Sequence, residues 1–118
     1  MLLKLFDSEL KIMEVLWKEG ELSAGQLAKL LNDQIGWNRN TTYTVLKKLV
    51  AKGAVERRDP GFLCRALISK EQVRRQEAND LVSKLFDNSA ELFLSAYLSG
   101  KKLSSEEISR LKSLVDKL

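Results

Sequence analysis

The chain has 118 residues, of which 44% are hydrophobic and 31% are charged, and its net charge is +4. This composition predicts one globular domain, or a small domain with an appended segment, and excludes a largely disordered chain. The chain has no histidine and one cysteine, Cys64. It therefore lacks the residues for an internal disulfide, an ordinary zinc site or histidine-based catalysis, and we expect no metal, no cofactor and no enzymatic activity.

Two observations predict where the protein resides. No stretch approaches the roughly 20 apolar residues that cross a bilayer, and the apolar run at the N-terminus is too short for a signal peptide. A single cysteine is compatible with a reducing compartment. We therefore expect a soluble, cytoplasmic protein without membrane insertion.

The positive charge is concentrated in residues 38–58. This segment has a net charge of +5, with Glu56 as its one acidic residue, whereas the rest of the chain has a net charge of −1. A local excess of this kind is typical of a surface that contacts nucleic acid.

The first two predicted helices are delimited by capping residues. Apolar spacing predicts a helix over about 7–18, with Asp7 as its N-cap. A second helix follows over about 24–32. Ser23 and Gln26 have the spacing of a capping box, in which each side chain bonds the other residue's backbone amide.

A third helix is predicted over 39–52, between the N-cap Asn38 and the terminating Gly53. One face is apolar, and the opposite face carries Asn40, Thr41, Thr44, Lys47 and Lys48, with Tyr43 at its edge. No acidic residue occurs from Trp37 to Gly53, although ordinary solvated helix faces mix acids with bases. Such a face can offer polar groups to base edges and lysines to phosphates.

Two short extended runs follow, 54–58 and 62–68, separated by Asp-Pro-Gly at 59–61. This pattern predicts a β-hairpin, in which Cys64 is a buried, apolar thiol. Three helices followed by a hairpin is the order of a winged helix-turn-helix. We therefore assign residues 1–68 to a winged-helix DNA-binding domain in a mostly α-helical protein.

Residues 69–118 are predicted to form three more helices. Their N-termini are marked by Ser69, Asn88 and Ser104, each followed three residues later by Gln or Glu. Three helices are too few to form a stable core alone, so their apolar stripes need another surface. We expect this domain to dimerise, although packing within one chain is the alternative. The predicted interface residues are Leu81, Leu85, Leu92, Phe93, Tyr97, Leu98, Ile108, Leu111, Leu114 and Val115.

The predicted DNA-binding residues fall into two groups. Asn40, Thr41, Tyr43 and Thr44 have side chains that can bond or contact base edges. The residues suited to phosphates are Arg39, Lys47 and Lys48 in the helix and Arg57, Arg58 and Arg65 in the hairpin. Because strand residues alternate between faces, we expect only one of Arg57 and Arg58 to face DNA.

With these elements placed, the chain resembles the BlaI/MecI/CopY family of bacterial transcriptional repressors, which are penicillinase-repressor-like winged-helix proteins. The resemblance rests on residues 9–17 (ELKIMEVLW), 41–53 (TTYTVLKKLVAKG) and 103–108 (LSSEEI), together with Leu111. It implies a homodimer that binds palindromic operators through its N-terminal winged helix and dimerises through its C-terminal helices.

The resemblance also implies routes of release from DNA. In the antibiotic-resistance branch, a membrane sensor-protease pathway leads to cleavage of an Asn-Phe bond. The matching bond here is Ala96-Tyr97, which lacks the asparagine. The copper branch binds metal through tail cysteines, and this tail has none. Thr41 matches a base-contacting threonine, but Asn40 replaces a lysine and Tyr43 an arginine, so the operator sequence does not carry over.

The sequence therefore predicts a homodimeric, sequence-specific repressor bound to a palindromic double-stranded DNA operator. The alternative is a winged-helix module for protein–protein contact without DNA sequence specificity. Salt dependence separates the two, because binding through phosphates weakens steeply as salt rises. Release by proteolysis, by a ligand or by a changed protein level stays open.

Overall fold

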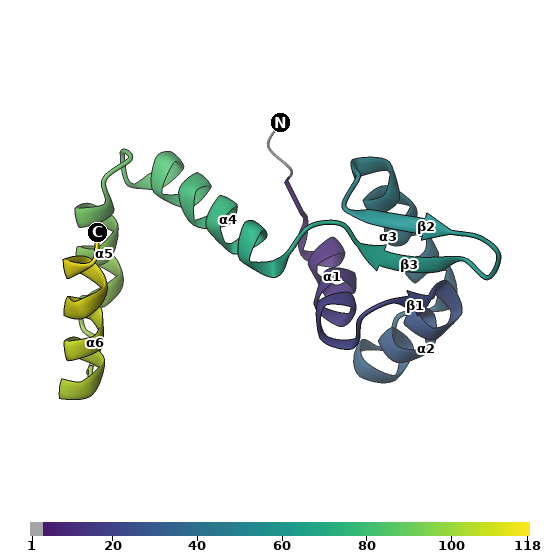
Figure 1. The fold of residues 1–118 in the computed structure, drawn as a ribbon, viewed down its shortest axis with the longest axis horizontal. Helices are drawn as coiled ribbons and strands as arrows, with labels where there is room; N and C mark the ends of the chain where they lie inside the picture. The colour runs from purple at the N-terminus through teal and green to yellow at the C-terminus, as the bar shows by residue number, and fades with distance from the viewer. Residues whose placement is uncertain (1–3) are drawn as a thin grey trace. The chain divides into compact units, whose positions relative to one another are not determined.

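The structure is a computed structural model that describes residues 4–118. Within them the helices are α1 (Asp7–Glu19), α2 (Ala24–Ile35), α3 (Arg39–Lys52), α4 (Lys70–Leu85), α5 (Ala90–Leu98) and α6 (Ser105–Asp116), and the strands are β1 (Leu22–Ser23), β2 (Val55–Arg58) and β3 (Leu63–Ala66) (Figure 1). The chain divides into two compact units, one ending at Glu77 and the other comprising Ala78–Leu118. The predicted fold class, mostly α-helical with a small hairpin, is confirmed.

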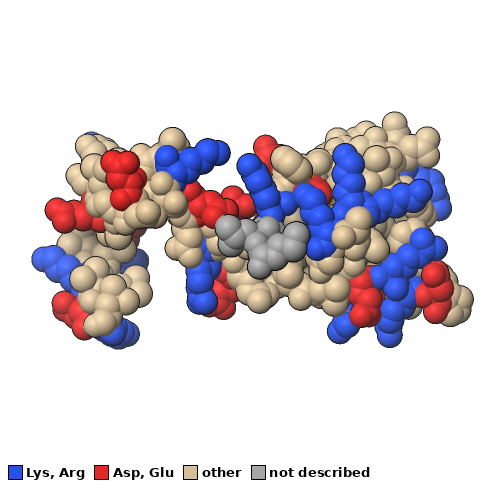
Figure 2. All heavy atoms as spheres, turned by 90° about the horizontal axis from the view of Figure 1, so that it is seen from above, with Lys and Arg blue, Asp and Glu red and all other residues tan. Residues whose placement is uncertain are grey.

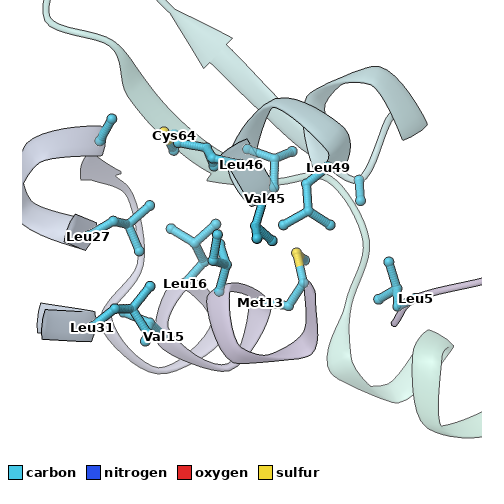
Figure 3. Close-up of a cluster of buried hydrophobic side chains, with 14 residues drawn as sticks. Leu5, Met13, Val15, Leu16, Leu27, Leu31, Val45, Leu46, Leu49 and Cys64 are labelled. Atoms are coloured by element: carbon cyan, nitrogen blue, oxygen red, sulfur yellow. The ribbon is translucent and has the colours of Figure 1, made fainter. Parts of the chain in front are cut away.

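The N-terminal unit is built around one hydrophobic core. Its members include Met13, Val15 and Leu16 of α1, Leu27 and Leu31 of α2, Val45, Leu46 and Leu49 of α3, and Cys64 of β3 (Figure 3). Because the apolar stripes of all three helices are used in this core, the polar face of each helix is left on the outside.

The sheet has one strand more than the predicted hairpin. Its order is β1-β3-β2, with both pairs antiparallel, and Leu22 and Ser23 of β1 lie opposite Cys64 and Leu63. A two-residue strand has no detectable alternation of polar and apolar residues, so sequence patterns did not predict it.

Local hydrogen bonds confirm several predicted caps. Ser23 and Gln26 bond each other's backbone amides at 3.1 and 2.9 Å, and Asn38 Oδ1 accepts a bond from the Thr41 amide at 2.8 Å. The predicted end of the second helix was wrong, because α2 continues to Ile35 before Gly36 adopts a left-handed conformation with φ of +72°.

The predicted cap of the first helix was also wrong. Asp7 is the first helical residue, and the extended residue before it is Phe6. A phenylalanine side chain cannot accept a hydrogen bond. The free amide of Phe6 is instead bound by Glu9 Oε1 at 2.8 Å, so the acidic residue in the first turn closes this helix end.

In the C-terminal region, Ser69 with Gln72 and Ser104 with Glu107 form the predicted capping boxes. The third predicted cap was wrong by one residue. Asn88 adopts a φ of +60°, and Ser89 accepts the bond from the Leu92 amide. Asparagine tolerates the left-handed conformation that this turn requires, which leaves the capping position to serine.

The boundary between the two units lies within α4, later than the sequence boundary after Ile68. Trp17 Nε1 donates a hydrogen bond to the Ile68 carbonyl at 2.9 Å, and Val73 packs against the core of the N-terminal unit. Lys70 also forms an ion pair with Glu14 at 3.0 Å. The first turns of α4 are thus anchored to the N-terminal unit.

Candidate nucleic-acid interface

Helix α3 is oriented by its apolar face. Thr42, Val45, Leu46 and Leu49 are buried, and this forces Asn40, Thr44, Lys47 and Lys48 to the exposed side. The helix ends at Gly53, whose φ of +80° is accessible to glycine at little cost. The exposed side therefore presents amide, hydroxyl and ammonium groups together, as the sequence predicted.

The predicted base-side residues differ in their exposure and in their hydrogen bonds within the protein. Asn40 and Thr44 are exposed, whereas Thr41 is partly buried. The Thr41 hydroxyl donates to Asn38 Oδ1 at 3.0 Å. Because its hydrogen is engaged in this cap, Thr41 can offer an outside ligand only an acceptor oxygen and its methyl group.

Tyr43 is placed differently from Asn40 and Thr44. Its ring packs edge-on against Phe62 with centroids 5.8 Å apart, and its hydroxyl accepts a hydrogen bond from Arg39 at 3.0 Å. The Arg39 guanidinium also lies 5.1 Å from the centre of the Tyr43 ring. Tyr43 therefore connects α3 to the segment that enters β3.

The cations of the basic segment divide into two classes. Among the residues that the structure describes, Arg39, Lys47 and Lys48 form no ion pair. Lys52, at the end of the same helix, binds Glu9 at 2.6 Å. The first three are available to a polyanion, whereas Lys52 is held within the protein.

We call residues 55–66, which comprise β2, β3 and the turn between them, the wing. Its arginines are all paired: Arg57 with Asp59 at 3.2 Å, Arg65 with Glu56 at 3.1 Å, and Arg58 with Glu21. The guanidinium carbon of Arg57 also lies 3.6 Å from the centre of the Phe62 ring. Arg57 and Arg58 thus contact different partners, in keeping with their alternation along β2.

Sequence reasoning did not identify Glu9 or Glu21 as partners of these cations. Glu9 is spaced three, four and seven residues before Ile12, Met13 and Leu16, so it lies on the apolar face of α1. An acid at that spacing is a detectable signal for a buried ion pair. The partner of Arg58 has no such signal, because Glu21 is distant along the chain.

Cys64 is completely buried, as predicted. Burial raises the pKa of its thiol to about 11, while the nearby Arg57 acts in the opposite direction. Among residues 4–118, no cluster of histidine, cysteine and acidic side chains has a metal-binding arrangement. No described helix combines the length and the apolar character needed to cross a membrane.

Helices α4, α5 and α6 contain no buried residue. Tyr97, Leu114 and Val115 are 56%, 61% and 59% exposed, and Phe93 and Leu98 are partly buried. The other predicted interface residues, Leu81, Leu85, Leu92, Ile108 and Leu111, are exposed as well. Within the Ala78–Leu118 unit, Phe93 packs against Phe86 and Tyr97, but Leu85, Leu114 and Val115 remain more than half exposed.

The bond between Ala96 and Tyr97 lies in the last turn of α5, which ends at Leu98. Both residues are exposed, and Lys101 lies 4.4 Å from the centre of the Tyr97 ring. The bond is therefore at the surface of this unit but within a hydrogen-bonded helix.

Comparison with known proteins links this geometry to one family. Residues 5–117 match the family model described as penicillinase repressor. The penicillinase repressor of Bacillus licheniformis is 24% identical over 112 residues, which cover 93% of this chain and 88% of that protein. The methicillin resistance regulatory protein MecI of Mammaliicoccus sciuri is 20% identical over 112 residues, with coverages of 93% and 91%.

A solved structure is similar to part of the chain. The solution structure of the DNA binding domain of the repressor BlaI matches with a TM-score of 0.55 and 28% identity. The match covers 59% of this chain and 88% of that domain. The winged-helix fold predicted from the order of elements is thus that of a known DNA-binding domain.

Proposed function

Since the chain belongs to the penicillinase repressor family, we propose that this DNA-binding transcriptional repressor acts as a homodimer on a palindromic operator. The observation that carries the proposal is the exposed face of α3. Asn40 and Thr44 lie there beside Lys47 and Lys48, and neither lysine forms an ion pair among the described residues. Such a face supplies both base-edge contacts and phosphate contacts.

We assign roles on α3 by side-chain chemistry. Asn40 can bond an adenine through its amide, and Thr41 and Thr44 can accept bonds or contact a thymine methyl group. Lys47, Lys48 and Arg39 suit phosphates. Tyr43, which was a base-side candidate from sequence, is supported better as a residue that positions the wing, because its ring and hydroxyl already have partners.

Dimerisation is supported by the uncovered apolar surface of the Ala78–Leu118 unit. Exposed apolar patches of this kind mark interaction sites, and a second copy offers the same surface in a two-fold arrangement. Residues such as Leu85, Tyr97, Leu114 and Val115 would be buried at this interface. Two-fold symmetric readers bind half-sites about one helical turn apart, which fits a palindromic operator.

The names of the relatives support a further assignment, the control of antibiotic-resistance genes. A membrane sensor-protease pathway is then one route of release, with a ligand or a changed protein level as the others. The proposed repression itself does not depend on which route operates.

Selection of bound sequences from a random pool of duplexes, using the full-length protein, tests the proposal. We expect inverted repeats with half-sites about one turn apart. Recovery of single half-sites would contradict the dimeric repressor. If the protein shows no salt-dependent and no sequence-dependent binding to the duplexes, the alternative, a protein–protein interaction module, is favoured instead.

A further inference from the structure

The three arginines of the wing have three carboxylate partners, two within the wing and one, Glu21, outside it. Arg57, Arg58 and Arg65 pair with Asp59, Glu21 and Glu56, respectively. Arg58 also lies 4.0 Å from Glu56, but Arg65 binds that carboxylate at the shorter distance of 3.1 Å, so Glu21 is the main partner of Arg58. At the lower right of the space-filling view, where the N-terminal unit is drawn, blue and red side chains lie side by side (Figure 2). The wing and Glu21 together are therefore electrically neutral, although the sequence of the wing is basic.

The Glu21–Arg58 pair depends on the tertiary fold. Arg58 Nη2 lies 2.6 Å from Glu21 Oε1 and also contacts Oε2, so both carboxylate oxygens are engaged. Glu21 immediately precedes β1, whereas Arg58 ends β2, and these are the two outer strands of the sheet. The pairing of β1 with β3 is what brings this carboxylate to the wing.

This pair is accessible to a competing anion. The Glu21 side chain is 32% exposed and the Arg58 side chain is 54% exposed. Exposed ion pairs are weak, so a DNA phosphate can displace the carboxylate. In the wild type, a phosphate contact by Arg58 competes with the bond to Glu21, so this contact forms in fewer complexes and yields less affinity than a phosphate contact by an unpaired lysine.

We propose that Glu21 limits the affinity of this repressor for DNA by holding Arg58 on the protein. The inference rests on the proposed function, because it assumes that DNA is bound through α3 and the wing. Arg39, Lys47 and Lys48, which form no ion pair among the described residues, supply most of the phosphate attraction, and Arg58 contributes little until the Glu21–Arg58 pair breaks. A carboxylate before β1 thus lowers the sequence-independent attraction by the contribution of one arginine.

The test uses full-length protein and a fluorescent duplex of random sequence, because phosphate attraction does not require the operator. The variants are Glu21→Gln, Arg58→Gln, the double variant and Glu19→Gln. Glu19 is exposed, so its substitution makes the same change in charge two residues from Glu21, and no ion pair of Glu19 occurs among the described residues. Anisotropy titrations are made between about 50 and 200 mM salt, within the range over which phosphate contacts weaken strongly.

Glu21→Gln is expected to bind more tightly at low salt than the wild type. One additional phosphate contact steepens the slope of log affinity against log salt by about 0.9 per bound protomer. The advantage of the variant should therefore shrink about 3.5-fold per protomer across this salt range. Glu19→Gln should change the slope little, and the double variant should bind like Arg58→Gln.

Two outcomes would show a general charge effect and overturn the inference. One is an equal gain in affinity for random DNA in Glu21→Gln and Glu19→Gln, and the other is a double variant that binds more tightly than Arg58→Gln. An unchanged slope in Glu21→Gln would also overturn it. In either case normal wild-type binding leaves the proposed function intact. Wild-type protein that binds neither the random pool nor any duplex selected from it would overturn both. Thermal unfolding of each variant establishes that the compared proteins are folded.

Discussion

The Nζ of Lys52 lies 2.6 Å from Oε1 of Glu9, so the last residue of α3 is joined to the first turn of α1 by an ion pair whose carboxylate is 1% exposed. The same oxygen accepts the Phe6 amide, and Lys52 also donates to the Lys4 carbonyl at 2.9 Å. Helix α3 is thereby fixed at the end opposite to its base-side residues. A lysine of the basic segment has a structural role.

Replacing Lys52 by Met should destabilise the protein by up to about 3 kcal/mol, because a buried carboxylate then has no countercharge. The salt slope of binding to random DNA should not change. Urea unfolding measures the first quantity, and combining Lys52→Met with Glu9→Leu should recover part of the stability. A stable Lys52→Met variant with a flattened salt slope would instead make Lys52 a phosphate contact.

Replacing Asn40 or Thr41 by Ala should cost about 1–3 kcal/mol on the selected operator and change binding to random DNA little, because base contacts carry the sequence preference. Lys48→Ala should weaken binding to both duplexes similarly and flatten the slope of log affinity against log salt by about 0.9, the value for one phosphate contact. Parallel titrations with the two duplexes separate these roles. Equal losses for Thr41→Ala on both duplexes would contradict its assignment.

Tyr43→Phe tests whether Tyr43 positions the wing or contacts a base. The variant keeps the edge-on contact with Phe62 and loses only the bond from Arg39. An exposed hydrogen bond contributes little, so operator affinity should change by less than about 0.5 kcal/mol. Tyr43→Ala should lower operator affinity more, because it also removes the packing of the ring against Phe62. If Tyr43→Phe instead lowered operator affinity by about 1–3 kcal/mol, the Tyr43 hydroxyl would be assigned as a base contact.

Truncation after Glu77 should give a folded, monomeric N-terminal unit. The cut keeps the contacts of Ile68 and Val73 with this unit and removes the uncovered apolar faces. Operator affinity should fall by at least 100-fold or so, because linked half-site contacts reinforce each other through effective concentration. Sedimentation reports the oligomeric state. If the truncated form remained dimeric, the dimer interface would have to lie in the N-terminal unit.

Release from DNA is tested at the Ala96-Tyr97 bond. The asparagine expected before the aromatic residue is absent, and a helical bond must open locally before a protease can cut it. We therefore expect intact mass spectrometry to find the uncleaved protein throughout induction in the native host. A fragment ending at Ala96 would instead establish proteolysis at this bond, and the cut would separate α6 from the rest of the proposed dimer interface.

The sequence alone determined the features that depend on neighbours within a few residues. Ser23, Asn38 and Ser104 each bond an amide three residues later, so a local pattern suffices to place the starts of α2, α3 and α6. The exposed polar face of α3 also follows from spacing, because one stripe must enter the core. Where two neighbouring residues could serve as a cap, as at Asn88 and Ser89, the pattern favoured Asn88 and was wrong by one residue.

Only the tertiary structure decided which charges in the basic segment are free. Lys48 and Lys52 are equally basic in sequence, but Lys52 meets Glu9 of α1 and Lys48 meets no acid among the described residues. Arg58 is paired because β1 brings Glu21 beside the wing. These pairs join residues far apart in the chain. The spacing of Glu9 marks a buried acid but does not identify Lys52 as its partner, and Glu21 carries no such signal, so the pairing follows only from the packing of the whole unit.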